Sequence, residues 1–291
     1  MTSASTWDPK GIISRTKSRV TFERSPSSAD YRLNLPFDGV DFWYVHTDAI
    51  TPDEALERFY HCLSDDEKDR HNRFVFEADR HSYLLSHVLL RLAVSHYLGL
   101  PPQSCTFQSG PYGKPSLSGP SEIPLKFNLS HTTGVAVCGV TLRDELGVDV
   151  EALSARPSIR EVAARFFAKP EVEMLEKLTG EESDERALEL WTLKESFVKA
   201  LGVGLSLEPH LFGFAFAPGG APYLEFTAGI GEPVQDWRFG RVNLRSSHTA
   251  AVAFHNPSSQ NLLLHAIELV PPNLSLRIRR LTPNPQNYWA V

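Results

Sequence analysis

The sequence is poor in cysteine and has no excess of positive charge. Its 291 residues include only three cysteines, Cys62, Cys105 and Cys138, which lie far apart without a CxxC pair. Neither a disulfide framework nor a cysteine zinc site is encoded, so a reducing compartment, the cytoplasm, is expected. The net charge of −6 provides no general attraction for DNA, RNA or an anionic membrane, and nucleic acid is not an expected partner.

Long apolar runs are also missing. The most apolar stretch, residues 83–100, has too many polar side chains for a membrane span: Ser86, His87, Arg91, Ser95 and His96. Residues 1–29 are rich in serine, threonine and basic residues and contain no apolar signal core. This composition argues against a secretory signal and favours a flexible arm over an organelle transit segment, which it could also suit. No membrane partner is expected.

The rest of the chain has an ordinary globular composition with periodic apolar segments. Apolar residues make up 42% of it, which is enough for a sizeable core. Helical spacing predicts one long helix from about Glu77 to Gly99 and another from Asp184 to Leu201, capped by Ser183. Shorter helices are expected over 158–167 and 170–178. Strands are expected over 39–48, 104–108, 126–130, 135–142, 146–151, 211–217, 222–227, 236–244, 249–255 and 262–269.

Two segments of the chain repeat each other. SHTTGVAV (130–137) and SHTAAVAF (247–254) share five residues at the same offsets, and each follows a long amphipathic helix. The repeat predicts two lobes built on one plan. The expected divisions are a flexible arm (1–37), an N-terminal lobe (38–151), a C-terminal lobe (152–270) and a tail without readable structure (271–291).

A pair of carboxylates lies in the segment LGVDVEAL (146–153). In a strand, Asp149 and Glu151 share one face while Val148 and Val150 share the other. Such alternation is common on the polar side of an edge strand, so this pair alone does not identify a site.

The helical segment LWTLKESFVKALGVG (190–204) adds charges that need an explanation. Trp191, Glu195 and Lys199 are spaced i, i+4, i+8 and share one face. A simple ion pair between Glu195 and Lys199, worth at most ~0.5 kcal/mol, would account for these two charges. It does not account for Lys194, which lies on the other face expected to pack.

Three carboxylates converging from a strand and a helix would provide oxygen ligands for a hard divalent cation such as Mg²⁺. Lysines beside such a site suit a polyanionic substrate, and this arrangement is expected for phosphoryl transfer. Asn128, Ser130 and His131, at the end of a predicted strand, could donate to phosphate, and so could Lys114 in the turn GPYGKP. His248, the equivalent of His131 in the second repeat, is expected to be structural because no DxE follows it.

Taken in order, the segments YGKP, FNLSHT, GVDVE, RFFAKPE and WTLKESFVKALGVGLSL resemble the Sfp-type 4′-phosphopantetheinyl transferases. The resemblance spans roughly Asp65 to Ser206. It implies an α+β fold of two pseudo-symmetric α/β lobes, each a small, mainly antiparallel sheet packed on a long helix, with the active site in the cleft between them. It also implies a monomer that uses Mg²⁺ to transfer the 4′-phosphopantetheine arm from coenzyme A to a serine of an apo acyl or peptidyl carrier protein. The released product would be adenosine 3′,5′-bisphosphate.

The resemblance also assigns roles to residues. Asp149, Glu151 and Glu195 match the Mg²⁺ ligands, and the catalytic residues would be Glu195, Lys199 and His131. Glu195 would act as base directly or through a water. The residues expected to bind coenzyme A are Arg80, Arg73, Lys114, Asn128, Ser130, His131, Glu171, Lys194 and Lys199. The arginines that hold the 3′-phosphate vary within the family, and Arg80 is the first choice here.

Two other function classes remain open at this point. A Mg²⁺-dependent nuclease or phosphohydrolase would also use strand carboxylates and a lysine, although Glu151 is followed by Ala152 and Leu153 in place of the E-x-K such enzymes need. A non-catalytic module that binds carrier proteins would share the fold, and the intact carboxylates and lysines argue against it.

Overall fold

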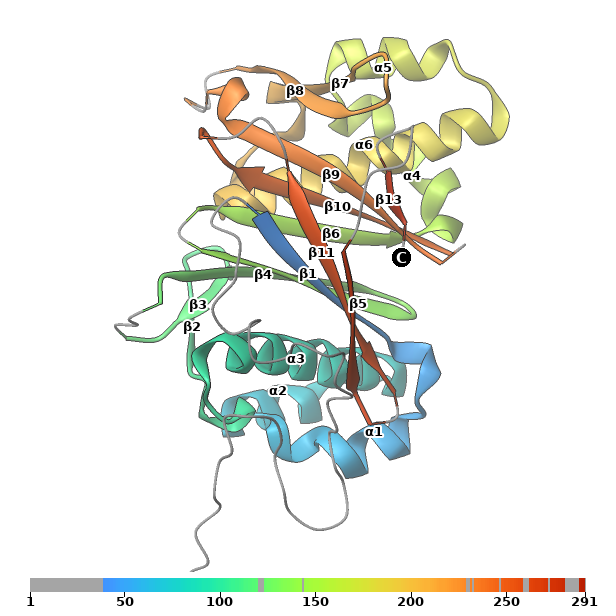
Figure 1. Cartoon of the computed structure of the whole chain (residues 1–291). Coiled ribbons are helices and arrows are strands. Elements are labelled where there is room, and N and C mark those ends of the chain that lie inside the picture. The colour runs from blue at the N-terminus through green and yellow to red at the C-terminus, as the bar shows by residue number, and fades with distance from the viewer. Residues whose placement is uncertain are drawn as a thin grey trace, which may run out of the picture.

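The computed structural model describes residues 39–291 except 120–122, 143, 229–230, 232, 246, 259–261, 272, 281–287 and 291. The predicted arm, residues 1–37, lies outside the described residues. Within them, the molecule consists of two sheets placed between two sets of helices (Figure 1). No helix in the described part of the chain is both long enough and apolar enough to cross a membrane.

The first half of the molecule is a five-stranded sheet packed on a long helix, α3 (Glu77–Leu98). The strand order is β12-β11-β1-β5-β4, and every neighbouring pair is antiparallel except β1 and β11. The strands are β1 (Gly39–His46), β4 (Leu125–Thr132), β5 (Val135–Leu142), β11 (Leu263–Val270) and β12 (Ser275–Arg280). Two shorter helices, α1 (Pro52–Phe59) and α2 (Asp65–Arg73), and the hairpin of β2 (Phe107–Ser109) and β3 (Pro115–Leu117) complete this half.

The second half repeats the arrangement with a four-stranded sheet packed on α6 (Gly180–Leu201). Its strand order is β13-β9-β10-β6, with only β13 and β9 parallel. The strands are β6 (Leu146–Ala152), β9 (Trp237–Leu244), β10 (His248–His255) and β13 (Tyr288–Ala290). The helices α4 (Arg156–Phe166) and α5 (Lys169–Glu176) lie beside α6, next to the hairpin of β7 (Phe212–Phe216) and β8 (Pro222–Thr227).

Three apolar cores hold these layers together. One lies between the first sheet and α1 and α3, and a second between the second sheet and α4 to α6. The third joins the inner faces of the two sheets, where Phe42, Val137, Val148 and Val252 are all fully buried. This is the predicted α+β fold of two sheets, each mainly antiparallel and packed on a long helix.

Helix ends follow their local sequence in most cases. Ser64 and Glu67 form a reciprocal capping box at the start of α2. Both α3 and α6 end at a glycine in the left-handed conformation, Gly99 and Gly202. The predicted start of α6 was wrong: the helix begins at Gly180, and the Ser183 hydroxyl inside it donates to the Leu175 carbonyl (3.3 Å).

Strand pairing crosses the predicted division at residues 151 and 152. Strand β6 precedes that division but pairs with β10, while β11 follows it but pairs with β1. The tail in which the sequence showed no readable structure, 271–291, contributes strands β12 and β13. It adds one edge strand to each sheet, and such long-range pairing leaves little trace in local sequence.

Strand β6 packs very closely on α6 at Gly147. A Cβ atom on Gly147 would lie 1.9 Å from the Ser196 carbonyl oxygen and 2.4 Å from the Ala200 nitrogen. Only a residue without a side chain permits this approach. It brings the strand that carries Asp149 and Glu151 directly onto the helix that carries Glu195.

We expect Gly147→Ala to destabilise the protein by at least ~1–3 kcal/mol, because the added methyl group must push α6 away from β6. Urea denaturation followed by circular dichroism measures this. Gly110→Ala is the matched control, since its Cβ would meet only the Lys114 carbonyl oxygen at 3.4 Å. Unchanged stability of the Gly147 variant would show that the two elements do not pack this closely.

Candidate active site

The centre of the site is a hydrogen-bonded group of three side chains from β4, β6 and α6. The Lys199 ammonium lies 2.6 Å from Asp149 Oδ1 and donates to Ser130 Oγ at 2.9 Å. The Ser130 hydroxyl in turn donates to the same Asp149 oxygen at 3.0 Å. Asp149 and Ser130 are buried, so these contacts hold both sheets and α6 in one arrangement.

Two more carboxylates, Glu151 and Glu195, lie close to Asp149. Burial, followed by the negative charge of Asp149, raises the pKa of Glu151 to about 7, although the Trp191 indole donates to its Oε1 (3.2 Å). The same two causes raise the pKa of Glu195, with Lys199 acting in the opposite direction. The site thus concentrates negative charge that one lysine only partly neutralises.

His131 extends the site to the start of α3. Its Nδ1 lies 3.1 Å from the Ser82 hydroxyl. Burial lowers the pKa of His131, and positive charge on His87 and Lys199 lowers it further, which places His131 in the same electrostatic environment as the lysine. His131 and Ser82 also line a cavity of about 760 Å³ together with Asp79, His81 and the residues of the η2 turn (Thr47–Ala49).

Asp149, Glu151 and Glu195 have the chemistry of a Mg²⁺ site, which prefers oxygen ligands. The second oxygen of Asp149, Oδ2, is buried and has no hydrogen-bond partner, and a buried carboxylate oxygen is costly in that state. Burial first, and then repulsion from Asp149, raises the pKa values of both glutamates, and a bound cation would offset both effects. Among the residues described, no three His, Cys, Asp or Glu side chains are already placed as ligands of one ion. The donor chemistry therefore fits a cation, and binding one would require the carboxylates to draw together.

Comparison with known proteins identifies the family. A family model described as "4'-phosphopantetheinyl transferase superfamily" matches residues 145–253, and one described as "4'-phosphopantetheinyl transferase, N-terminal" matches residues 51–141. The 4′-phosphopantetheinyl transferase HetI of Nostoc sp. is 34% identical over 60% of this chain and 73% of its own length. The chain belongs to the 4′-phosphopantetheinyl transferase family. The recognition from sequence and the prediction of a transferase are thereby confirmed.

Other members of the family match a similar part of the chain. The 4′-phosphopantetheinyl transferase Sfp of Bacillus subtilis is 32% identical over 56% of this chain and 70% of its own. The L-aminoadipate-semialdehyde dehydrogenase-phosphopantetheinyl transferase of Mus musculus is 31% identical over 67% of this chain and 68% of its own. A solved structure, the holo-[acyl-carrier-protein] synthase of Thermotoga maritima, covers 38% of this chain and 62% of its own at 21% identity and a TM-score of 0.32, too partial a likeness to support an argument.

The structure gives structural partners in the core to Lys194 and Glu171, both of which were expected to bind coenzyme A. Both side chains are at most 2% exposed, and they pair with each other at 2.8 Å. The Lys194 ammonium also donates to the carbonyls of Pro209 (2.8 Å) and Phe212 (2.6 Å), so its three N–H donors are all used. These contacts join α5, α6 and β7 in the core.

Glu171 is equally well satisfied. It accepts from the backbone N–H groups of Ala168 (2.8 Å) and Phe214 (2.9 Å) as well as from Lys194. Burial still raises its pKa and lowers that of Lys194, which is the expected result when two charges leave water.

Two further residues expected to bind phosphate have structural contacts instead. Asn128 is buried, and its Oδ1 accepts from the Val148 N–H (2.9 Å), which joins β4 to β6. The Lys114 ammonium binds Glu145 Oε2 (2.7 Å) and the Ala200 carbonyl (2.6 Å), so it caps the C-terminus of α6. The sequence indicated none of these partners, because Val148, Glu145 and Ala200 lie 20, 31 and 86 residues away from the side chains they contact.

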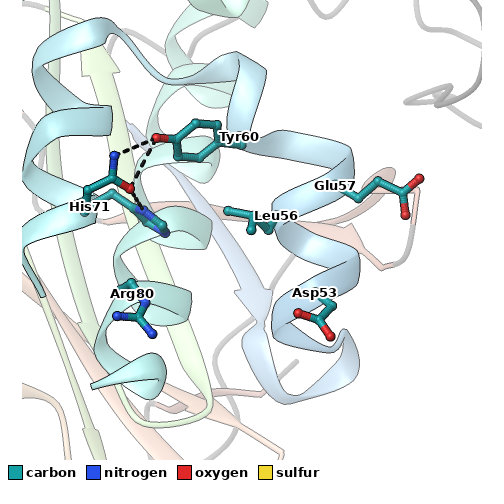
Figure 2. A pocket seen from close by; sticks show the side chains of 7 residues that line it. Asp53, Leu56, Glu57, Tyr60, His71 and Arg80 are labelled. Atoms are coloured by element: carbon teal, nitrogen blue, oxygen red, sulfur yellow. Dashed lines mark hydrogen bonds between the residues drawn. The ribbon is translucent and has the colours of Figure 1, made fainter. Parts of the chain in front are cut away.

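The arginines expected at the 3′-phosphate, Arg80 and Arg73, are not among the residues lining the cavity beside His131. Arg80 lines a separate groove of about 590 Å³ with Asp53, Leu56 and Tyr60, and Figure 2 shows it across the groove from α1. Its guanidinium donates to the Phe74 carbonyl at 2.9 Å. Arg73 is exposed at the end of α2. Their role stays a prediction.

Sequence reasoning missed Ser82, the partner of His131. Ser82 is one of several polar residues near the start of α3, in the segment EADRHSY (77–83), and no local pattern marks it. The only available signal was the unusual polarity of the first turns of an otherwise buried helix.

We expect Lys194→Met to lower the free energy of unfolding by ~3–5 kcal/mol, because it leaves the buried Glu171 carboxylate without its partner. Chemical denaturation checks the loss, with the exposed Lys177→Met as control. The folded fraction should bind coenzyme A with wild-type affinity. Normal stability with a tenfold loss of coenzyme A affinity would support the phosphate-binding role expected from sequence.

We expect Glu151→Gln to raise the melting temperature of the metal-free protein at pH 8 and to leave it unchanged below about pH 5. In the folded protein the carboxyl has a pKa of about 7, above its usual 4.5, so this group destabilises the fold progressively as pH rises from about 4.5 through 7. Each kcal/mol of destabilisation that the substitution removes would raise the melting temperature by roughly 2–4 °C. Calorimetry from pH 5 to 8 tests this, and a gain at pH 5 equal to that at pH 8 would contradict it.

Proposed function

We propose that this protein carries out Mg²⁺-dependent transfer of the 4′-phosphopantetheine arm from coenzyme A to a serine of an apo acyl or peptidyl carrier protein, with release of adenosine 3′,5′-bisphosphate. The observation that supports it is the contact of Lys199 with Asp149 at the edges of the two sheets, with Glu151 and Glu195 within range of the Asp149 charge and His131 within range of the Lys199 charge. Acidic ligands beside cationic and hydrogen-bonding groups suit a pyrophosphate held through a divalent ion.

Asp149, Glu151 and Glu195 would hold the Mg²⁺ ion. Bound there, the ion supplies Lewis-acid polarisation of the pyrophosphate and neutralises part of its charge. The unpartnered Asp149 Oδ2 and the raised pKa values of the two glutamates favour this assignment.

Lys199 and His131 would bind the phosphate oxygens. Lys199 uses two of its three N–H donors on Asp149 and Ser130, which leaves one for a phosphate oxygen. His131 lines the cavity and is close enough to Lys199 for that positive charge to lower its pKa, so its ring is proposed to contact a group bound beside Lys199. The lowered pKa of His131 makes it a neutral donor near pH 7 that would gain a proton as phosphate approaches.

Glu195 is the candidate base, acting directly or through a water. Its raised pKa brings it closer to the operating pH than an ordinary carboxylate, as general-base catalysis requires. The serine hydroxyl of the carrier would lose its proton to Glu195 while its oxygen bonds to the β-phosphorus of coenzyme A. The bond from that phosphorus to the bridging oxygen then breaks, and the nucleotide leaves.

The expected partners are coenzyme A and carrier proteins of fatty acid, polyketide or nonribosomal peptide synthesis. Family membership supports this class of reaction. A cytoplasmic, monomeric enzyme stays a prediction from sequence.

We expect Glu195→Gln to reduce the transfer rate about 10²- to 10³-fold at saturating Mg²⁺, because the variant loses both a charged ligand and the base. Mass spectrometry of an apo carrier incubated with coenzyme A follows the gain of the arm. Glu182→Gln, on an exposed site in the first turn of the same helix, is the control and should retain wild-type rates. A Glu195 variant with near wild-type transfer would remove the assigned role.

Incubating the wild-type protein with coenzyme A plus apo carrier, and separately with DNA, distinguishes the transferase from a nuclease. Consumption of coenzyme A only in the presence of carrier supports the proposal. Cleavage of DNA, or binding of coenzyme A without turnover, would favour the other two function classes.

A further inference from the structure

The second copy of the repeated SHT sequence contacts the first. His248 opens β10, and its Nε2 lies 2.7 Å from the Thr133 carbonyl oxygen, in the turn between β4 and β5. Since a carbonyl only accepts, Nε2 carries the proton and donates. The other ring nitrogen, Nδ1, lies 2.9 Å from the Ser247 hydroxyl. The imidazole is 7% exposed and thus fixed between the two sheets.

The turn that His248 contacts is also held from its other side. The Gly134 carbonyl accepts from the Thr47 N–H at 3.0 Å. Gly134 has φ +89°, and a Cβ there would lie 3.3 Å from the His248 ring. A side chain at position 134 would therefore press against the ring that supports the turn.

This turn directly follows the part of the site that comes from β4. Ser130 and His131 precede Thr133 by three and two residues. Only Thr132 lies between His131 and Thr133. Displacing the Thr133 carbonyl would shift His131 relative to Ser82 and Lys199. A change in the position of His248 would therefore change the position of His131.

We propose that His248 is a positioning residue for His131: through its bond to the Thr133 carbonyl it fixes the β4–β5 turn so that His131 faces the bound phosphates. This inference rests on the proposed function for the identity of the ligand, but the positioning itself is a property of the fold. His248 would not touch the substrate.

Two variants of His248 separate its hydrogen bond from its bulk. His248→Gln retains an N–H donor near the Nε2 position, whereas His248→Leu fills the space without a donor. We expect the leucine variant to raise KM for coenzyme A about tenfold with KM for the carrier unchanged, and the glutamine variant to stay within about threefold of wild type. His255→Leu, at the opposite end of the same strand, is the control and should behave as wild type.

A double-mutant cycle tests whether His248 acts through His131. Adding His248→Leu to His131→Ala should change KM for coenzyme A less than about twofold, because the group that His248 positions is then missing. Additive losses, or equal losses for the two His248 variants, would overturn the proposal.

A measurement that does not depend on activity can test the positioning role of His248 even if the proposed function is wrong. The imidazole NMR signals of His131 and their pH titration should change in His248→Leu and be restored in His248→Gln. If the wild-type protein transfers nothing from coenzyme A, the proposed function fails while these signals still decide the positioning. Unchanged His131 signals in a folded leucine variant would refute the positioning whatever the activity.

Discussion

The close packing of β6 on α6 is the constraint on which the candidate site depends. At Gly147 the strand lies so near the Ser196 carbonyl that no side chain fits between them. Two residues further along, the strand presents Asp149, and the helix presents Lys199 to it at 2.6 Å. Because neither element can shift without losing this contact, the carboxylates of the strand and the charges of the helix are brought together by the fold before any ligand arrives.

The two lysines of α6 differ in burial, and this difference separates a lysine with structural contacts from one that can bind a ligand. Lys194 is 2% exposed and has three acceptors around it, whereas the Lys199 side chain is 30% exposed and keeps one donor. Five residues apart on a helix of 3.6 residues per turn, they face directions about 140° apart. One therefore points toward α5 and β7, and the other toward Asp149. The helix is charged on both faces because it neutralises Glu171 in the core and serves the site on the opposite side.

Local sequence was sufficient for most elements and for which charged residues of β6 and α6 share a face. Alternation placed Asp149 and Glu151 on one face, and helical spacing placed Glu195 with Lys199, as the structure has them. What it could not supply was the identity of distant partners: Lys114 meets a carbonyl 86 residues away, and Asn128 an N–H 20 residues away. The tail strands β12 and β13 were missed for the same reason, since their pairing is determined by the open edges of the sheets they join.

The seam between the two sheets explains why the site draws on both halves of the molecule. Strands β4 and β6 are the terminal strands of their sheets, and they meet side by side, joined by the bond from the Val148 N–H to Asn128. Edge strands that meet in this way leave their polar side chains facing a common space, where Ser130 of one sheet reaches Asp149 of the other. A charged cluster placed inside either sheet would lose access to solvent, and one on an outer face would lose its burial. At this junction of the two sheets, burial raises the pKa values of Glu151 and Glu195 while neither side chain is fully enclosed.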